Sequence, residues 1–229
     1  MPLVCRSATG GKPKTSFDLP DLNRRVQGRC PNGMMGTHPD TKSDLRRRLR
    51  ARRRRLRGRA ARRAAALATR RLTALDGWQR ARHVGIYWPA DGEIDTRPLI
   101  AAATRAGKHV YLPVIRSSPG DLAFRRHRPG APLQRGRFGL PIPPRAGAPQ
   151  RRLAGLDLLV MPLVGFDAAG HRLGMGGGFY DRTLAGRGRC RRPLRVGLAY
   201  ACQQHPAIPH DRWDQRLDRV VTDRTVHVW

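Results

Sequence analysis

The sequence is short of acidic residues and of lysine, and both shortages narrow what the chain can bind. The chain has only 16 Asp or Glu residues but 46 Lys or Arg residues. Its formal net charge is therefore +30, which favours anionic partners. Four of these cations are lysines and the rest are arginines, whose rigid fork of donors suits phosphate and carboxylate groups. A single surface arginine can equally be a solvated charge. Composition alone therefore leaves nucleic-acid binding open.

Cysteine is also scarce, and long apolar runs are absent. The four cysteines form no C-x-x-C pair and have no histidine at zinc-finger spacing, so we expect free thiols and neither a disulfide framework nor a structural metal. No apolar run reaches the roughly 18 to 20 residues that span a bilayer, and the first thirty residues hold no apolar signal-peptide core. We therefore expect a cytoplasmic protein. Hydrophobic residues make up 39% of the chain, enough for one globular core.

The first forty residues differ in kind from the rest. They are rich in Gly, Pro, Ser, Thr and Asn and show no periodicity, so we expect residues 1–40 to be a disordered extension. Residues 41–229 are expected to form a single globular domain.

This domain is predicted to open with one long basic helix from Thr41 to about Leu72, with Asp44 in the first turn. Fourteen arginines and Lys42 surround its one apolar stripe, which comprises Leu45, Leu49, Leu56, Ala60 and Leu67. Like charges four residues apart repel by roughly a few tenths of a kcal/mol per pair. The helix therefore needs tertiary packing or an anion.

Short apolar runs alternate with helical stretches in the remainder of the chain. The predicted strands are residues 83–88, 110–115, 156–161 and 194–200. A helix is predicted over residues 96–106, ended by Gly107, and it connects two strands as a right-handed crossover does. Residues 119–152 contain many Pro, Gly and Arg residues, so we expect long loops around a short extended piece at 138–142. The pattern predicts an α/β fold with a mostly parallel sheet.

A glycine-rich loop at residues 174–178 follows the third predicted strand and leads into a helix from about Phe179. Its four glycines permit positive φ angles, so successive backbone N–H groups can face an anion. A Walker loop would end in Gly-Lys-Ser/Thr, which is absent, and a dinucleotide fingerprint would need glycine where Phe179 stands. On the glycines alone, a flexible surface loop remains the alternative.

Two aspartates are candidate ligands for Mg²⁺. Asp181 directly follows the glycine loop, where a carboxylate would repel phosphate unless a divalent cation lay between them. Asp218, just before a late strand, is a plausible second ligand, because Mg²⁺ is typically held by one or two carboxylates together with substrate phosphates. Taken singly, each aspartate could equally be a helix cap or a salt-bridge residue.

The loop after the first predicted strand places aromatic residues beside carboxylates, at the sheet edge where open α/β proteins bind ligands. Trp88 offers a stacking face, and Glu93 could accept hydrogen bonds from the N–H groups of a pterin-like ring. The alternative is that Tyr87 and Trp88 are core residues and that Asp95 or Thr96 caps the next helix.

Taken together, these motifs resemble the 5-formyltetrahydrofolate cyclo-ligases, also called 5,10-methenyltetrahydrofolate synthetases. The resemblance covers about residues 42–222. It is carried by KSDLR at 42–46, YWPADGEID at 87–95, FGLPIP at 138–143, PLVGFD at 162–167 and RLGMGGGFYD at 172–181. It implies a three-layer α/β/α fold related to the ribose-phosphate isomerase and CoA-transferase group, and a folate enzyme that depends on ATP and Mg²⁺.

Carried over residue by residue, the resemblance implies three sets of site residues. ATP-binding residues would be Lys42, Arg46, Arg172, Leu173, Gly174, Met175, Gly176, Gly177, Gly178, Phe179 and Tyr180. Folate-binding residues would be Trp88, Glu93, Met175, Gly176, Gly177, Gly178 and Phe179. Magnesium would be held by Asp181 and Asp218. Family members often have Arg or Tyr at the position of Met175 and Lys or Gly at that of Gly177, so side-chain charge is missing here.

The implied reaction joins N10 of 5-formyltetrahydrofolate to its formyl carbon, after the formyl oxygen has been phosphorylated by ATP, and gives 5,10-methenyltetrahydrofolate, ADP and phosphate. No covalent nucleophile from the protein is needed, because phosphoryl transfer depends on positioning and charge neutralisation. The alternative hypothesis is an arginine-rich RNA-binding protein, in which the first helix docks on phosphates and the α/β body is a scaffold. The glycine loop and the Trp88 loop favour the enzyme, since a scaffold requires neither.

Overall fold

The computed structural model describes residues 41–116, 121–146, 148–185 and 192–229. The predicted disordered extension, residues 1–40, lies outside these ranges, as do three of the four cysteines. The fourth, Cys202, is a free thiol. None of the helices in the described ranges has the length and apolarity that a bilayer crossing requires.

An eight-stranded sheet forms the centre of the molecule, in the order β12-β11-β10-β7-β1-β2-β3-β6. Its strands are β1 (His83–Ile86), β2 (His109–Ile115), β3 (Leu122–His127), β6 (Gln150–Arg151), β7 (Leu158–Met161), β10 (Leu194–Ala199), β11 (Arg219–Thr222) and β12 (Val226–Val228). The five central strands, from β11 to β2, are parallel, whereas β12, β3 and β6 are antiparallel to their neighbours. The predicted α/β fold with a mostly parallel sheet is confirmed, and all four predicted strands are present.

The prediction of long loops over residues 119–152 was wrong in part, because β3 lies there and pairs with β2 along six residues. Phe124 is fully buried in β3, and burying this ring stabilises a strand whose neighbouring Pro and Gly residues suggested a loop. The described residues also form two small hairpins: β4 (Gln134–Arg135) with β5 (Pro141–Ile142), and β8 (Gly165–Phe166) with β9 (Arg172–Leu173).

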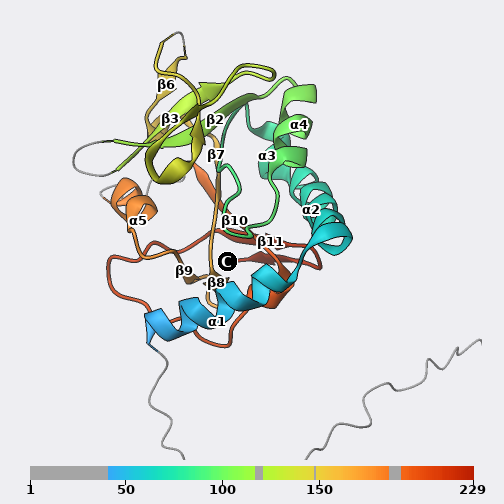
Figure 1. Ribbon diagram of the computed structural model, residues 1–229, viewed down its shortest axis with the longest axis vertical. Coiled ribbons are helices and arrows are strands. Elements are labelled where there is room, and N and C mark those ends of the chain that lie inside the picture. The colour runs from blue at the N-terminus through green and yellow to red at the C-terminus, as the bar shows by residue number, and fades with distance from the viewer. Residues whose placement is uncertain (1–40, 117–120, 147, 186–191) are drawn as a thin grey trace, which may run out of the picture. The chain divides into compact units, whose positions relative to one another are not determined.

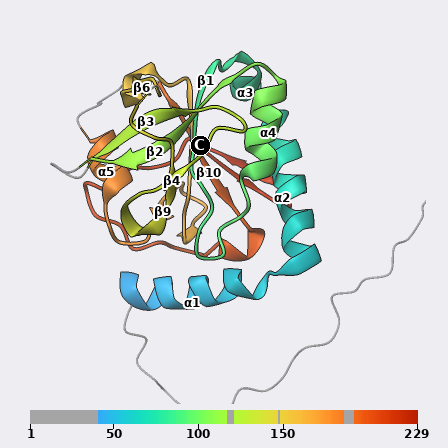
Figure 2. The same cartoon turned by 45° about the horizontal axis from the view of Figure 1, so that its top comes forward.

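The single long basic helix was also a wrong prediction, because the segment forms two helices, α1 (Lys42–Arg55) and α2 (Gly58–Thr73). Leu56 and Arg57 between them are extended, and Gly58 has a φ of +57°. Glycine adopts this left-handed conformation without steric cost. The break lets α1 lie across one end of the sheet while α2 runs along a face of it (Figures 1 and 2).

Apolar cores lie on both faces of the sheet. On one face, α2, α3 (Asp76–Arg80) and α4 (Arg97–Arg105) pack their buried side chains on the strands. The other face is covered by the 3₁₀ turn η2 (Leu153–Gly155), by α5 (Phe179–Leu184) and by loops. A third, small cluster holds α1 to the body through Leu45, Leu49, Val164, Leu173 and Ile208. Burial of the two leucines offsets the charge repulsion within α1.

Candidate functional site

A cleft of about 880 Å³ opens where β1, β2 and β7 end and where α1 begins. This is the carboxyl end of the parallel strands, where open α/β sheets bind ligands. Every residue that the sequence singled out for ATP or folate lines it, together with Asp181. They are Lys42, Arg46, Trp88, Glu93, Arg172, Leu173, Gly174, Met175, Gly176, Gly177, Gly178, Phe179, Tyr180 and Asp181. The structure thus brings these residues together, while their individual roles stay predictions.

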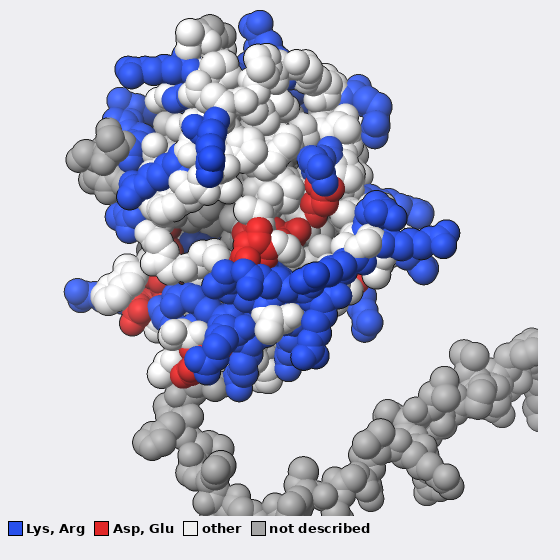
Figure 3. Space-filling view, viewed as in Figure 1, with Lys and Arg blue, Asp and Glu red and all other residues white. Residues whose placement is uncertain are grey.

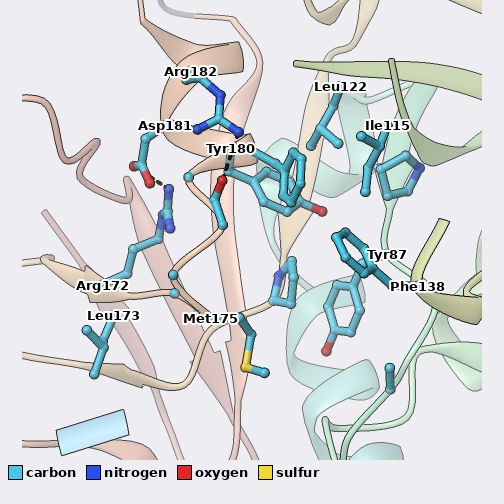
Figure 4. Close-up of a pocket in the computed structure, with 18 of the residues that line it drawn as sticks. Tyr87, Ile115, Leu122, Phe138, Arg172, Leu173, Met175, Tyr180, Asp181 and Arg182 are labelled. Atoms are coloured by element: carbon cyan, nitrogen blue, oxygen red, sulfur yellow. Dashed lines mark hydrogen bonds and ion pairs between the residues drawn. The ribbon is translucent and has the colours of Figure 1, made fainter. Parts of the chain in front are cut away.

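The glycine loop forms one wall of the cleft and ends at the start of α5. Gly176 has a φ of +98° and Gly178 a φ of +63°, both in the region that residues with a Cβ atom disfavour. The loop is tied to its surroundings, because Arg46 Nε donates to the carbonyl of Gly174 at 2.8 Å and Arg182 Nη2 donates to that of Gly177 at 2.8 Å. The loop is therefore held by two arginine side chains, which differs from the flexible surface loop that the glycines alone allowed (Figure 4).

Cations and carboxylates alternate at the end of the cleft nearest Lys42, the first residue of α1. Lys42 Nζ lies 2.6 Å from Asp211 and 2.5 Å from Asp214. Burial alone would lower the pKa of the Lys42 ammonium, but the hydrogen bonds to the two aspartates raise it above its ordinary value. Lys42 is therefore charged. Arg172 Nη2 donates to Asp181 Oδ1 at 2.6 Å (Figure 4). This part of the cleft therefore presents fixed cations whose partners are carboxylates.

Asp218 is not part of this cluster. It stands just before β11, at the amino end of the parallel strands, and its carboxylate accepts from Arg195 N at 2.7 Å and from Arg195 Nη2 at 2.6 Å. The predicted pairing of Asp181 with Asp218 is therefore not formed. The segment that reaches the cleft lies a few residues before Asp218. There, Asp214 accepts from Lys42 Nζ, and the backbone N–H of Gln215 donates to Asp181 Oδ1 at 3.1 Å.

The end of the cleft nearest the last turn of α1 holds Glu93, the only glutamate in the sequence. It closes a tight turn in which Asp91 and Gly92 have φ of 50° and 73°, and in which Glu93 N donates to Ala90 O at 2.8 Å. Positive φ at both central residues is typical of a type I′ turn. Glu93 Oε2 accepts from Ala90 N at 3.0 Å, and only 11% of the side chain is exposed. Burial raises the pKa of its carboxyl to about 7.

Three apolar side chains of the cleft are exposed, and the sequence analysis named only one of them, Met175, as a site residue. Phe138, Met175 and Trp213 all line the cleft and are exposed. Phe138 belongs to the FGLPIP motif, but the extended piece expected at 138–142 is a 3₁₀ turn (Arg137–Gly139) followed by β5. Its ring points edge-on at Phe179, with centroids 6.1 Å apart. Exposed aromatic and thioether groups at a cleft are typical of a surface that a ligand covers.

The predicted stacking residue Trp88 is half-buried and lines the cleft, with its ring edge-on to His127 at 6.2 Å. Tyr87 is buried and donates through its hydroxyl to Ile94 O at 3.1 Å, as the core interpretation expects. Asp95 accepts from Arg97 N at 2.9 Å. Tyr87 is therefore a core residue and Asp95 accepts at the start of α4, while the ligand-binding roles of Trp88 and Glu93 stay predictions.

Two charged residues near Glu93 were missed. Arg53 of α1 is fully buried, and Asp91 is bound by Arg50, Arg53 and Arg54. A signal for Arg53 was present, because it continues the buried stripe of Leu45 and Leu49 at the next four-residue step.

Comparison with known proteins supplies a family for this arrangement. Residues 38–223 match the 5-formyltetrahydrofolate cyclo-ligase family. The chain is 43% identical over 150 residues to the 5-formyltetrahydrofolate cyclo-ligase of Escherichia coli K12. This match covers 65% of this chain and 82% of that protein. It is 28% identical over 190 residues to the mouse protein of that name, covering 79% of this chain and 92% of that one.

A solved structure has the same fold. The NMR structure of Aquifex aeolicus 5,10-methenyltetrahydrofolate synthetase superimposes with a TM-score of 0.71 at 30% identity, covering 82% of this chain and 92% of that one. These comparisons give no support to the RNA-binding alternative.

Proposed function

Because the chain belongs to the 5-formyltetrahydrofolate cyclo-ligase family, we propose that it converts 5-formyltetrahydrofolate to 5,10-methenyltetrahydrofolate, with ATP yielding ADP and phosphate. The observation that carries this proposal is a single cleft with two chemically different ends. One end offers cations and a glycine loop, which suit a triphosphate. The other offers the aromatic side chains of Trp88 and Phe138 and one buried carboxylate, which suit a flat ring that bears N–H donors.

The reaction requires a phosphoryl transfer and a ring closure. The formyl oxygen on N5 attacks the γ-phosphorus of ATP, and ADP leaves. N10 then attacks the activated formyl carbon, its proton passes to solvent, and the formyl oxygen departs with phosphate. The protein's part is to hold the two substrates in line and to neutralise charge.

At the triphosphate end, Lys42 and Arg46 supply the charge, and the N–H groups of residues 174–178 supply neutral donors. The glycine loop connects the two ends, because the carbonyl of Gly174 accepts from Arg46 Nε at 2.8 Å and Met175 Sδ lies 4.0 Å from Arg53 Nη2, whose guanidinium faces Glu93. The formyl oxygen of a bound folate would therefore lie next to the γ-phosphate, as in-line transfer requires.

Magnesium fits the carboxylates at this end. Asp181 and Asp214 both line the cleft and carry the hard oxygen donors that Mg²⁺ prefers, and the backbone N–H of Gln215, which follows Asp214, donates to Asp181 Oδ1. We propose these two residues, in place of the pair with Asp218, as the ones that would hold a phosphate-bound Mg²⁺. The ion would supply countercharge to the triphosphate. Lys42 and Arg172, which now bind the two carboxylates, would then be available to phosphate oxygens.

At the folate end, the buried carboxylate of Glu93 would accept hydrogen bonds from ring N–H groups while Trp88 and Phe138 form apolar walls. Tyr87 and Tyr180 close the floor of the cleft, and burial raises the pKa of both hydroxyl groups, so both stay neutral donors.

The test is a direct assay of product formation. Purified protein with 5-formyltetrahydrofolate, ATP and Mg²⁺ should show the absorbance of the methenyl product increasing with time, with one ADP formed per product. Omission of ATP should abolish the signal. Absence of ATP-dependent product from folded protein would refute the proposed function.

A further inference from the structure

We propose that Arg53 is a positioning residue of the folate end: from behind the wall of the cleft, its guanidinium fixes the turn at residues 90–93 and places a positive charge behind the carboxylate of Glu93. This inference rests on the proposed function, because it concerns how that substrate is held. Arg53 does not line the cleft, so it would act through Glu93 and not by touching substrate.

The burial of Arg53 is the first observation. Its side chain has 0% exposure, although it lies in a run of four arginines in α1. Taking a guanidinium out of water is costly unless its donors are satisfied and its charge is matched. A helix with many exposed arginines has no need of a buried one for solubility, so the position calls for a specific account.

The second observation is what the guanidinium holds. Arg53 Nε and Nη2 both donate to the carbonyl of Asp91, at 3.1 and 3.0 Å, and Nη2 also donates to Asp91 Oδ2 at 2.9 Å. Nη1 donates to the carbonyl of Leu163, in the segment after β7, at 3.2 Å. The Nη2 atom also lies 4.0 Å from Met175 Sδ of the glycine loop. One side chain thus ties α1 to the turn that carries Glu93, to the end of β7 and to the glycine loop.

These contacts need the shape of arginine. A planar fork can donate to a backbone carbonyl from two nitrogens while a third donates elsewhere, whereas the ammonium of lysine is a single point. The backbone carbonyl of Asp91 lies in a turn with two positive φ angles, a conformation that Asp tolerates better than most side chains but that is uncommon. The hydrogen bonds of Arg53 to this carbonyl therefore help to define the turn.

The third observation concerns the charges around Glu93. Arg53 Nη1 lies 3.9 Å from Glu93 Oε1, and Arg53 is the cation that lowers the pKa of the carboxyl against the effect of burial. The other groups that face Glu93 are Asp91 of its own turn, Tyr87 at the end of β1 and Tyr180 of α5. The tyrosines are neutral, and the arginines around Asp91 overcome its burial and lower its pKa to about 2, so Asp91 stays ionised and repels. Loss of Arg53 would therefore leave Glu93 with no favourable charge.

The composition of the chain allows a direct experiment. Because Glu93 is the only glutamate, cell-free synthesis with glutamate labelled by ¹³C at Cδ gives a protein with one labelled carboxyl group. Its chemical shift, followed from pH 5 to pH 9, reports the protonation of Glu93 without any assumption about activity. The proteins to compare are the full chain, Arg53→Met, Arg53→Lys and the matched control Arg52→Met, which removes one charge from the exposed face of the same helix.

Arg53→Met should move the titration midpoint of Glu93 up by at least one pH unit, whereas Arg53→Lys and Arg52→Met should leave it within a few tenths. In the assay at pH 7, Arg53→Met should raise KM for 5-formyltetrahydrofolate at least tenfold and KM for ATP less than twofold. Arg53→Lys keeps the charge but loses the planar fork of donors. At pH 7 it should raise KM for 5-formyltetrahydrofolate less than Arg53→Met does, and the pH at which this KM changes should stay that of the full chain.

A midpoint for Arg53→Met equal to that of the full chain would overturn the inference, as would equal increases in the two KM values. If Arg53→Met does not fold, Arg53→Lys decides: a rise in KM for folate alone supports the inference, and a rise in both or neither refutes it. Absence of turnover in the full chain would refute the proposed function, while the titration would still measure the electrostatic part of the inference.

Discussion

Replacing Glu93 with Gln should stabilise the protein at alkaline pH even though it removes a proposed ligand group. Burial raises the pKa of this carboxyl from its ordinary 4.5 to about 7, so the folded state binds the proton more tightly than the unfolded state. A group of this kind contributes stability that is fully present below pH 4.5 and is lost as the pH rises through 7. Glutamine carries no such proton, so the variant should not show this loss.

The size of the effect follows from the same values. A tenfold change in proton affinity corresponds to about 1.4 kcal/mol, so the rise from 4.5 to about 7 corresponds to about 3 kcal/mol for a group that is only 11% exposed. The stability of Glu93→Gln relative to the parent should therefore increase between pH 5 and pH 8 by up to about 3 kcal/mol. Because the two proteins share all other titratable groups, the contributions of those groups cancel when the two free energies of unfolding are subtracted.

Urea unfolding of both proteins at pH 5, 6, 7 and 8 measures this difference, with folate binding recorded on the same samples. Loss of the carboxylate should weaken binding of 5-formyltetrahydrofolate about tenfold or more, since an unpaired ligand N–H costs about 1 to 3 kcal/mol. A stability difference that does not depend on pH, or that falls as pH rises, would show that Glu93 is not held in the buried environment described here.

Other residues give sharp predictions of their own. Asp181→Asn should lower kcat and raise the Mg²⁺ concentration needed for half-maximal rate, whereas Asp218→Asn should leave the Mg²⁺ dependence unchanged; equal responses would refute the metal assignment. Lys42→Ala should raise KM for ATP about tenfold or more and KM for folate little, because one charge-assisted hydrogen bond is worth about 1.5 to 3 kcal/mol. Gly178→Ala should lower the stability measured by thermal unfolding by about 1 kcal/mol, because alanine is disfavoured at a φ of +63°. If the exposed arginines of α1 and α2 bind RNA, affinity should fall steeply with salt (Figure 3), and a salt-independent or undetectable affinity would end that alternative.

The sequence predicted the parts of the fold whose signal is local. The central strands are buried on both faces and therefore appear as continuous apolar runs, such as the one that became β7. The glycine loop and the residues around it were identified because backbone N–H groups, a following helix and a nearby carboxylate are close together in sequence. Residues 172–181 accordingly lie together in the cleft.

What the sequence did not predict depends on how distant segments pack. The stripe of α1 and the stripe of α2 have the same period, so periodicity alone could not show that the chain bends at Leu56. Asp214 and Asp218 are both preceded by irregular chain, and only the path of that segment decides which one reaches the cleft. Arg53 looked like one more surface arginine because its partners, Asp91 and Leu163, are far away in sequence.

The position of α1 also bears on when the site can form as the chain is made. Lys42 binds Asp214, 172 residues later, and Arg46 binds Gly174, 128 residues later. Mutual repulsion among its arginines leaves α1 poorly stable alone, so it should dock after the sheet has formed. A nascent chain therefore cannot complete the cleft until Gly174 and Asp214 have both left the ribosome. In the finished protein, the amide protons of α1 should exchange with solvent before those of the central strands, and each such opening takes both Lys42 and Arg53 out of place.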